Sequence, residues 1–284
     1  MTQSIVYAVN DHMYDFFVAS QESRLQNAPE FPCYVIPFSD DFEKINSLKK
    51  VFDFEVLETD LEKWDRLGER IWGNTPHRPS VEKKSYFRKL AMFEAPTDSF
   101  LFVDANTVFV DKIAYYMNLF ASSDLDISFM SYSLPGRNFQ HGGLIDLLDQ
   151  INPEVRHGFN CGFVLGRQDL GLYEAMSLLA APGQKLQRVF GGAPEQAFLA
   201  YVAGLTGKKM ARFIDILPQA QTELGTEVDL TVRGGNKMFG PKSSSPGKRV
   251  FFLKWNGAKM HDGLVNFNIL DEFHKAGLAR LAGS

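Results

Sequence analysis

Apolar and polar positions in the first half of the chain predict strands and helices in alternation. Runs such as Ile5–Val9 are short and apolar, as buried strands are. Each run is followed by a longer stretch whose apolar residues recur at helical spacing. The strands expected in this half span residues 5–9, 33–37 and 54–57, and the first two helices span 14–26 and 41–51.

Two further helices are expected before the next strand. Thr59 and Glu62 have the spacing of a capping box, so one helix should begin there and continue toward Trp72. Residues 73–80 are rich in Gly, Asn, Pro and Ser and predict a loop. The second helix, 81–93, is indicated by apolar residues at helical spacing, namely Tyr86, Leu90 and Phe93.

Residues 99–103 form a continuous apolar run that ends at Asp104. Such a run indicates a strand buried on both faces, as in a parallel sheet. Together with the strand–helix alternation before it, the run predicts an α/β fold with a doubly wound sheet. Ligands of such sheets bind beyond the carboxyl ends of the strands, which is where Asp104 stands.

The second half of the chain is less regular, so the sheet is expected to be mixed with an irregular C-terminal portion. Residues 233–248 are polar and rich in breakers and predict a loop or hairpin. We expect a single domain over 1–284, with a nucleotide-binding half at 1–112 and an acceptor-side half at 113–284. The expected strands are 126–131, 162–165, 212–217 and 250–253, and the helices 143–151, 169–181, 195–203 and 270–281.

Composition narrows the class of protein. The chain has 284 residues, 45% of them hydrophobic and 23% charged, which is typical of a globular protein. Its net charge of −4 argues against a nucleic-acid binder. No run approaches the roughly 18 apolar residues of a membrane span, and Met1–Ser4 lacks the basic start of a signal peptide. We therefore expect a cytoplasmic protein, with Cys33 and Cys161 as buried, reduced thiols.

The strongest candidate for chemistry is the polar break after the strand at 99–103. Asp104 and Asn106 both offer side-chain oxygens, which a hard cation such as Mg²⁺ or Mn²⁺ prefers. The competing interpretation is a hairpin turn, because Asp and Asn bond readily to their own backbone.

The run Phe100–Val110 resembles the DxD segment of nucleotide-sugar glycosyltransferases with the GT-A fold, in which a hydrophobic strand precedes Asp-Ala-Asp. The resemblance extends from residue 5 to about 260, and family eight-like transferases are the nearest relatives that it indicates. Segments that agree with this superfamily in kind and order are the strand at 5–9 with Asn10, the basic helix 84–90, Phe159–Leu165, Ala193–Phe198 and Lys254–Gly257.

The resemblance implies transfer of a sugar from a nucleoside diphosphate, with a UDP-sugar expected, to an acceptor hydroxyl. It implies Glu195 and Asp104 as catalytic residues and Asp104, Asn106 and His261 as metal ligands. The donor-binding residues that it implies are Ala8, Asn10, Tyr14, Asp40, Arg88, Lys89, Asp104, Ala105, Asn106, Asn160, Gly162, Gln196, Lys254 and Gly257.

Two departures from the family pattern concern the metal. Asn106 stands at the second aspartate, so the site loses a negative charge and should bind a cation more weakly. Lys254 stands where relatives carry a metal-binding His, while His261 lies seven positions further on. Our hypothesis is that Mn²⁺ or Mg²⁺ dependence is weak or absent, with Lys254 stabilising the leaving diphosphate. Full activity in EDTA would support it, and loss restored by Mn²⁺ would contradict it.

Several of these residues also have a purely structural interpretation. Tyr14 stacks on a base or packs in the core, and Asp40 binds uracil or ribose or caps a helix. Arg88 and Lys89 point about a quarter-turn apart on an α-helix, so only one should reach the site; Arg suits a phosphate better. Glu195 serves as acid/base or stabilises a helix dipole.

Two other functions remain open. A sugar-phosphate nucleotidyltransferase would carry a Gly-rich phosphate loop after the first strand, whereas Ala8–His12 contains no glycine. A catalytically inactive relative, binding a sugar nucleotide or a protein, would be consistent with Asn106 and Lys254. The acceptor is undetermined among saccharide, lipid-linked and protein substrates, so a peripheral role at a membrane also stays open. The sequence does not choose between retention and inversion.

Overall fold

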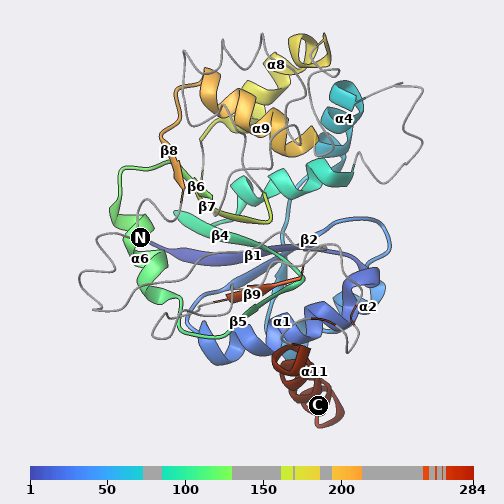
Figure 1. Cartoon of the computed structure of the whole chain (residues 1–284). Coiled ribbons are helices and arrows are strands. Elements are labelled where there is room, and N and C mark those ends of the chain that lie inside the picture. Colours follow the sequence, from blue (N-terminus) through green and yellow to red (C-terminus); the bar gives the residue numbers. More distant parts are fainter. Residues whose placement is uncertain are drawn as a thin grey trace.

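A seven-stranded mixed sheet runs through the middle of the molecule (Figure 1). The computed structural model describes residues 1–72, 85–129, 161–168, 170–185, 194–212, 252–255, 260, 264 and 267–284. Neighbouring strands are parallel except at β7, which is antiparallel to both β4 and β6. The order across the sheet is β3 (Glu55–Val56), β2 (Cys33–Pro37), β1 (Gln3–Val9), β4 (Ser99–Asp104), β7 (Phe163–Arg167), β6 (Ile127–Phe129) and β8 (Met210–Arg212).

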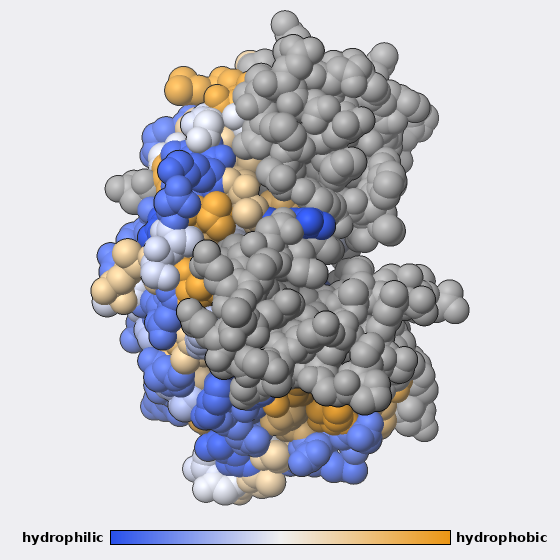
Figure 2. Space-filling view, turned by 60° about the vertical axis from the view of Figure 1, so that its left-hand side comes forward, coloured by the Kyte–Doolittle hydropathy of each residue, from blue (hydrophilic) through white to orange (hydrophobic). Residues whose placement is uncertain are grey.

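Helices cover both faces of this sheet, which confirms the doubly wound α/β fold (Figure 1). One face carries α4 (Leu61–Trp72), the 3₁₀ helix η2 (Tyr86–Glu94), α8 (Leu172–Lys185) and α9 (Pro194–Leu205). The other face carries η1 (Asp11–Met13), α1 (Tyr14–Asn27), α2 (Glu43–Ser47), α3 (Lys49–Phe52) and α6 (Ala114–Ser122), with α11 (Phe267–Ala282) packed outside α1. On the face shown in Figure 2, the described surface mixes hydrophilic and hydrophobic residues in small patches.

The alternation of side chains along β4 builds the two cores. Phe100 and Phe102 point into the core beneath η2, α4 and α9, whereas Leu101 and Val103 point into the core beneath α1 and α6. All four are buried. The strand is therefore apolar on both faces, as its continuous run predicted, and Asp104 is the first polar residue at its end.

A second, two-stranded sheet lies beside the main one and was not expected from the pattern. It pairs β5 (Thr107–Phe109) with β9 (Phe252–Lys254) in antiparallel register. The sequence analysis also missed α6, because Ala114–Ser122 is apolar nearly all round and shows no clear helical face.

Some predicted elements differ in type or extent. The helix expected at 41–51 is two short helices, α2 and α3. The strand expected at 212–217 overlaps β8 (Met210–Arg212) at Arg212, and residues 213–217 lie outside the described residues, so that prediction stays open. Residues 73–80, 143–151 and 233–248 lie outside the described residues, so those predictions stay open.

The helix α4 begins one residue later than the capping-box spacing predicted. Asp60 accepts a hydrogen bond from the backbone N–H of Lys63 at 3.1 Å, so Asp60 is the cap. The Thr59 hydroxyl instead donates to the carboxylate of Glu94. Within the described residues, no helix combines the length and apolar character needed to span a bilayer.

Candidate active site

The candidate site lies at the carboxyl ends of β1 and β4. The strand order reverses between these two strands, since β2 and β3 extend the sheet on one side and β7 on the other. Such a switch point is where open α/β sheets bind ligands. Ala8 and Asp104 are register partners across β1 and β4, so the polar residues that follow both strands meet at this edge.

Asp104 forms ion pairs through both of its carboxylate oxygens. Its Oδ1 lies 2.9 Å from Nζ of Lys89, and its Oδ2 lies 2.7 Å from Nζ of Lys254. The three side chains are largely withdrawn from solvent, with exposed fractions of 19% for Asp104, 13% for Lys89 and 4% for Lys254. The site thus contains a carboxylate held between two ammonium groups.

The small β5–β9 sheet brings Lys254 to Asp104 across 150 positions of sequence. The chain turns after Asp104 into β5, and Thr107 of β5 is the register partner of Lys254 in β9. Asn106 fixes the same end of the ladder: its side-chain Nδ2 donates to the carbonyl of Trp255 at 2.5 Å, and its carbonyl accepts from the N–H of Trp255 at 3.0 Å. Asn106 therefore acts here as a clamp on the strand that carries Lys254.

The 3₁₀ helix η2 carries both basic residues, and its orientation sets which of them faces Asp104. The segment was predicted to be an α-helix, but Tyr86–Glu94 is a 3₁₀ helix, with three residues per turn. Phe87, Leu90 and Phe93 therefore align on the buried side, and neighbouring side chains diverge by about a third of a turn. This divergence sends Lys89 toward Asp104 and turns Arg88 elsewhere.

Arg88 lies against two other carboxylates. Its Nε and Nη2 donate to Asp65 at 2.9 and 2.6 Å, and Nη2 also donates to Asp40 at 3.0 Å. The hydrogen bonds that Arg88 donates to Asp65, opposed by burial, raise the pKa of the guanidinium. Asp40 is almost fully exposed and caps none of the described helices; at α2 the N–H groups of Lys44 and Ile45 donate to Asp11 instead, at 3.0 Å each.

Lys89 is held by rings as well as by charge. Its ammonium lies 5.6 Å from the ring centre of Phe38 and 5.8 Å from that of Tyr86. These two rings meet edge to face with centres 5.2 Å apart. The ring contacts add a favourable cation–π interaction and restrict the side chain to the Asp104 side.

The charges of the cluster shift one another's pKa values. Burial alone would raise the pKa of Asp104, but Lys254 and Lys89 hold it well below its usual range. Burial lowers the pKa of Lys89, and the nearby charges of Asp104 and Glu195 more than reverse this, so that it stays protonated. Burial lowers the pKa of Lys254 despite the pull of Asp104.

Glu195 enters this cluster from the first turn of α9. Its side chain is 1% exposed, and among the described residues its Oε2 has no hydrogen-bond partner. Burial raises its pKa, while the charge of Lys89 opposes the rise. Gln196, also buried, donates to the Glu195 side chain. A buried carboxylate next to an ammonium group is suited to receive a proton or to bind a hydroxyl.

Other predicted donor-binding residues lie at the same edge. Asn10 follows β1 and donates from Nδ2 to the hydroxyl of Ser39 at 3.2 Å, which ties the ends of β1 and β2 together. Gly162 is buried and accepts from the N–H of Asp104 at 3.1 Å, and Ala105 is buried in the turn. Tyr14 is partly buried against the core beneath α1. Asn160, Gly257 and His261 lie outside the described residues.

The described residues do not fit a divalent cation at Asp104. Both of its oxygens already contact ammonium groups, and a metal there would lie beside two positive charges. Asn106 keeps one buried oxygen, Oδ1, that has no hydrogen-bond partner in the described part of the chain. In the part of the chain that the structure describes, no three His, Cys, Asp or Glu residues cluster as a metal site.

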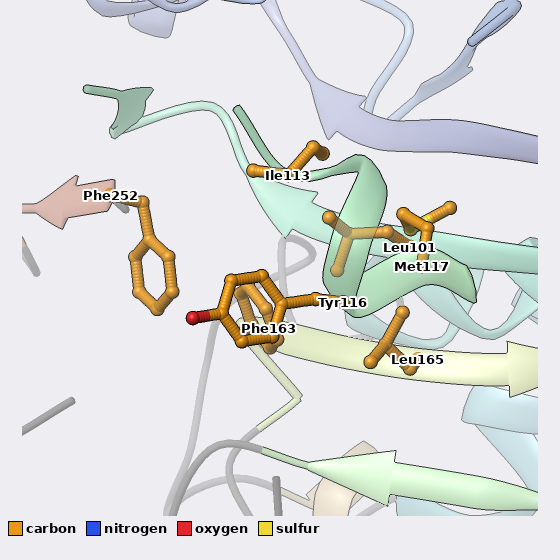
Figure 3. Close-up of a pocket in the computed structure, with 7 residues that line it drawn as sticks. All are labelled: Leu101, Ile113, Tyr116, Met117, Phe163, Leu165 and Phe252. Atoms are coloured by element: carbon orange, nitrogen blue, oxygen red, sulfur yellow. The ribbon is translucent and has the colours of Figure 1, made fainter. Parts of the chain in front are cut away.

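A separate apolar pocket lies on the opposite face of β4 (Figure 3). Phe163 and Phe252 stack at its edge with ring centres 4.7 Å apart. Side chains alternate along β4, so Leu101 and Asp104 point to opposite faces of the sheet. The pocket, which Leu101 lines, is therefore separate from the charge cluster at Asp104. Its lining residues are Leu101, Ile113, Tyr116, Met117, Phe163, Leu165 and Phe252.

The sequence analysis gave no place in the site to Asp65 or Cys161, although it predicted correctly that Cys161 is a buried thiol. Asp65 is buried beside Trp64 in α4. The signal for it in the sequence is an acidic residue among the apolar positions of a helix, because a buried carboxylate needs a basic partner. Cys161 is buried at the edge of the cluster. Burial and the charge of Glu195 raise the pKa of its thiol well above the usual value, so it remains a neutral thiol.

Solved glycosyltransferase structures share this fold. An active-site mutant of LgtC matches with a TM-score of 0.56 and 12% identity, covering 96% of this chain and 95% of that one. Mouse xyloside xylosyltransferase 1 matches with a TM-score of 0.51 and 13% identity, covering 75% of this chain and 85% of that one. Core-mannan synthase A from Aspergillus fumigatus, in a Mn/GDP form, matches with a TM-score of 0.50 and 12% identity, covering 76% of this chain and 73% of that one.

No protein-family model matches the sequence, and a search of curated proteins found no relative. At such low identity, the structural likeness establishes the fold and leaves the chemistry to the residues of this chain. The chain has the GT-A fold of these glycosyltransferases.

Proposed function

We propose that this chain with the GT-A fold is a glycosyltransferase that moves a sugar from a nucleoside diphosphate sugar to an acceptor hydroxyl. The observation that carries the proposal is the Lys89–Asp104–Lys254 cluster at the carboxyl ends of β1 and β4. A switch point of this kind is the usual ligand site of the sheet. We take a UDP-sugar as the first donor to test, because the resemblance of the DxD-like segment favours it.

The charge of the cluster suits a diphosphate. Two ammonium groups face the single carboxylate of Asp104, so these three side chains together carry one net positive charge. An anionic ligand would balance the excess positive charge in a place where water screens it poorly. Ammonium–phosphate hydrogen bonds are among the stronger polar interactions in proteins.

The same charges fit the chemistry of transfer. The bond between the sugar C1 and the diphosphate oxygen breaks, and its electron pair leaves with the nucleoside diphosphate. The acceptor hydroxyl oxygen forms the new bond to C1, and its proton passes to the carboxylate of Glu195 in an inverting reaction or to the departing diphosphate in a retaining one. Stabilising the departing diphosphate is the main electrostatic task in this step, and ammonium groups held in place perform it without reorganisation.

Glu195 is our candidate for the group that meets the acceptor or the donor sugar. Its unpartnered Oε2 is a buried acceptor that a sugar hydroxyl would satisfy. Gln196 lies beside it and is placed to bind the same sugar. In this proposal residues 1–112 hold the nucleotide, through Ala8, Asn10, Tyr14 and Asp40, and residues 113–284 provide the acceptor side.

Binding of nucleoside diphosphates tests the proposal first. Thermal shifts with UDP, GDP and ADP should show stabilisation by one of them, with UDP expected. Asp104→Asn should abolish the shift, because it removes the carboxylate that holds both lysines. Asp124→Asn, which changes an exposed carboxylate paired with Lys209, should leave it intact. No shift with any nucleotide would overturn the proposal.

Turnover then separates an enzyme from an inactive relative. Release of UDP from a UDP-sugar panel, with and without saccharide acceptors, should be measurable and should fall in Glu195→Gln while UDP binding persists. Binding without release of UDP in any condition would instead indicate a sugar-nucleotide-binding protein.

A further inference from the structure

We propose that Lys89 and Lys254, held together by Asp104, replace the divalent cation, so that the donor diphosphate binds without metal. This inference rests on the proposed function and concerns the same site. It assigns Asp104 a new role, in which the carboxylate positions two ammonium groups and does not ligate a metal.

The occupancy of the Asp104 oxygens is the first step of the argument. Oδ1 contacts Lys89 at 2.9 Å and Oδ2 contacts Lys254 at 2.7 Å. A cation bound to either oxygen would have to displace an ammonium group, and the second ammonium would still repel it. Lys254 is 4% exposed and belongs to a paired strand, so displacing it would leave a buried charge without a partner.

The second step concerns Asn106, which occupies the other ligand position of the segment. Its amide is engaged with Trp255 through Nδ2, which leaves Oδ1 as one neutral oxygen. A single neutral oxygen is a poor match for Mg²⁺ or Mn²⁺ when the neighbouring carboxylate is already paired. The same hydrogen bond holds the end of β9, and hence Lys254, beside Asp104.

The third step is that two ammonium groups supply the same formal charge as one divalent cation. Lys254 comes from the end of β9, and Lys89 is confined by Asp104 and by the rings of Phe38 and Tyr86. Both are therefore fixed before a ligand arrives, as electrostatic stabilisation of a leaving group requires. Each can donate to phosphate with a proton that does not point at Asp104, because an ammonium group has three donors.

Calorimetric titration with UDP, in EDTA and then in Mn²⁺, tests the inference on the wild-type chain. We expect the two dissociation constants to agree within about twofold. An affinity at least about tenfold higher with Mn²⁺ would overturn it while leaving the proposed function standing. If no nucleoside diphosphate binds in either condition, the proposed function itself fails and the inference falls with it. Titration with Mn²⁺ alone should show no binding.

Variants of the two lysines give a second readout. In EDTA, Lys254→Met should weaken UDP binding by about tenfold or more, because a charge-assisted hydrogen bond is lost. Lys209→Met removes an exposed lysine paired with Asp124 and should change nothing. Circular dichroism would verify folding. If Lys254→Met does not fold, Lys89→Met, at a less buried position, provides the same measurement. Unchanged affinity in the folded variant would contradict the role.

Discussion

Asn106 and Trp255 bond to each other twice, with the Asn106 side chain and carbonyl both engaged by the Trp255 backbone. The two residues are 149 positions apart, and Asn106 is 6% exposed. The side-chain hydrogen bond requires a donor on Asn106, because its acceptor is the carbonyl oxygen of Trp255. An aspartate at this position has no such donor when ionised.

Placing an aspartate at position 106, as in the Asp-Ala-Asp pattern, should therefore lower the stability of the fold. We expect Asn106→Asp to destabilise folding by about 3 kcal/mol, since a buried carboxylate would face the carbonyl of Trp255. Asn106→Ala should destabilise it by only about 1–2 kcal/mol, because it removes the hydrogen bond without adding a charge. Urea unfolding of both variants at neutral pH measures the difference. If Asp is tolerated better than Ala, the clamp role of Asn106 is wrong.

Arg88 offers a comparison of two carboxylates on one guanidinium. Asp65 is 13% exposed and bonds bidentately, whereas Asp40 is 95% exposed and makes one bond. Asp65→Asn should destabilise the chain by about 3 kcal/mol, because it leaves the charge of Arg88 without its buried partner. Asp40→Asn should leave stability unchanged. Chemical denaturation of the pair tests this, and equal losses would contradict the argument.

The alternation of strands and helices in the first half of the chain, and the sheet edge that holds the candidate site, could be predicted from the sequence because they depend on local patterns. The apolar run before Asp104 dictates a strand buried on both faces, and parallel strands bring their polar ends to one edge. Asp104 and the end of β1 therefore meet where the pattern placed them, with Ala8 as the register partner of Asp104.

The contacts of the basic residues could not be predicted in the same way. The preference of arginine for phosphate favoured Arg88 for the site, but η2 is oriented so that Lys89 contacts Asp104 and Arg88 contacts Asp65. The approach of Lys254 depends on the pairing of β5 with β9, two strands of three residues far apart in sequence. Short strands gain their stability from such long-range pairing, which no local pattern records.

Gly166 in β7 faces the ring of Phe100 in β4. A Cβ at residue 166 would lie 2.4 Å from Cζ of Phe100, whose ring is fully buried and meets Phe93 edge to face. Gly166→Ala should destabilise the chain by about 1–3 kcal/mol through overpacking.

A shorter partner should relieve this clash. In the Phe100→Leu background, Gly166→Ala should be less damaging by at least about 0.5 kcal/mol, which a double-mutant cycle measures. Gly283→Ala, whose Cβ would lie 3.7 Å or more from its neighbours, is the neutral control. Strict additivity between residues 100 and 166 would show that the loss has another cause.

The C-terminal helix α11 is tied to α1 by a charged pair with a defined pH dependence. Arg280 donates from Nε and Nη2 to the two oxygens of Glu22 at 2.7 and 3.1 Å, and the hydrogen bonds from Arg280 lower the pKa of Glu22. The unfolded chain then binds a proton more readily than the folded one. The stabilisation is therefore present above pH about 4.3 and is lost as the pH falls through the lower pKa of Glu22 in the folded chain.

Arg280→Met should destabilise the chain by about 1–2 kcal/mol at neutral pH, with the difference from wild type shrinking toward about pH 3. Urea unfolding across this range tests it, with Lys275→Met, an exposed pair partner of Asp271 on the same helix, as the control. A loss that is equal at all pH values would mean that Arg280 stabilises α11 only through the packing of its aliphatic stem.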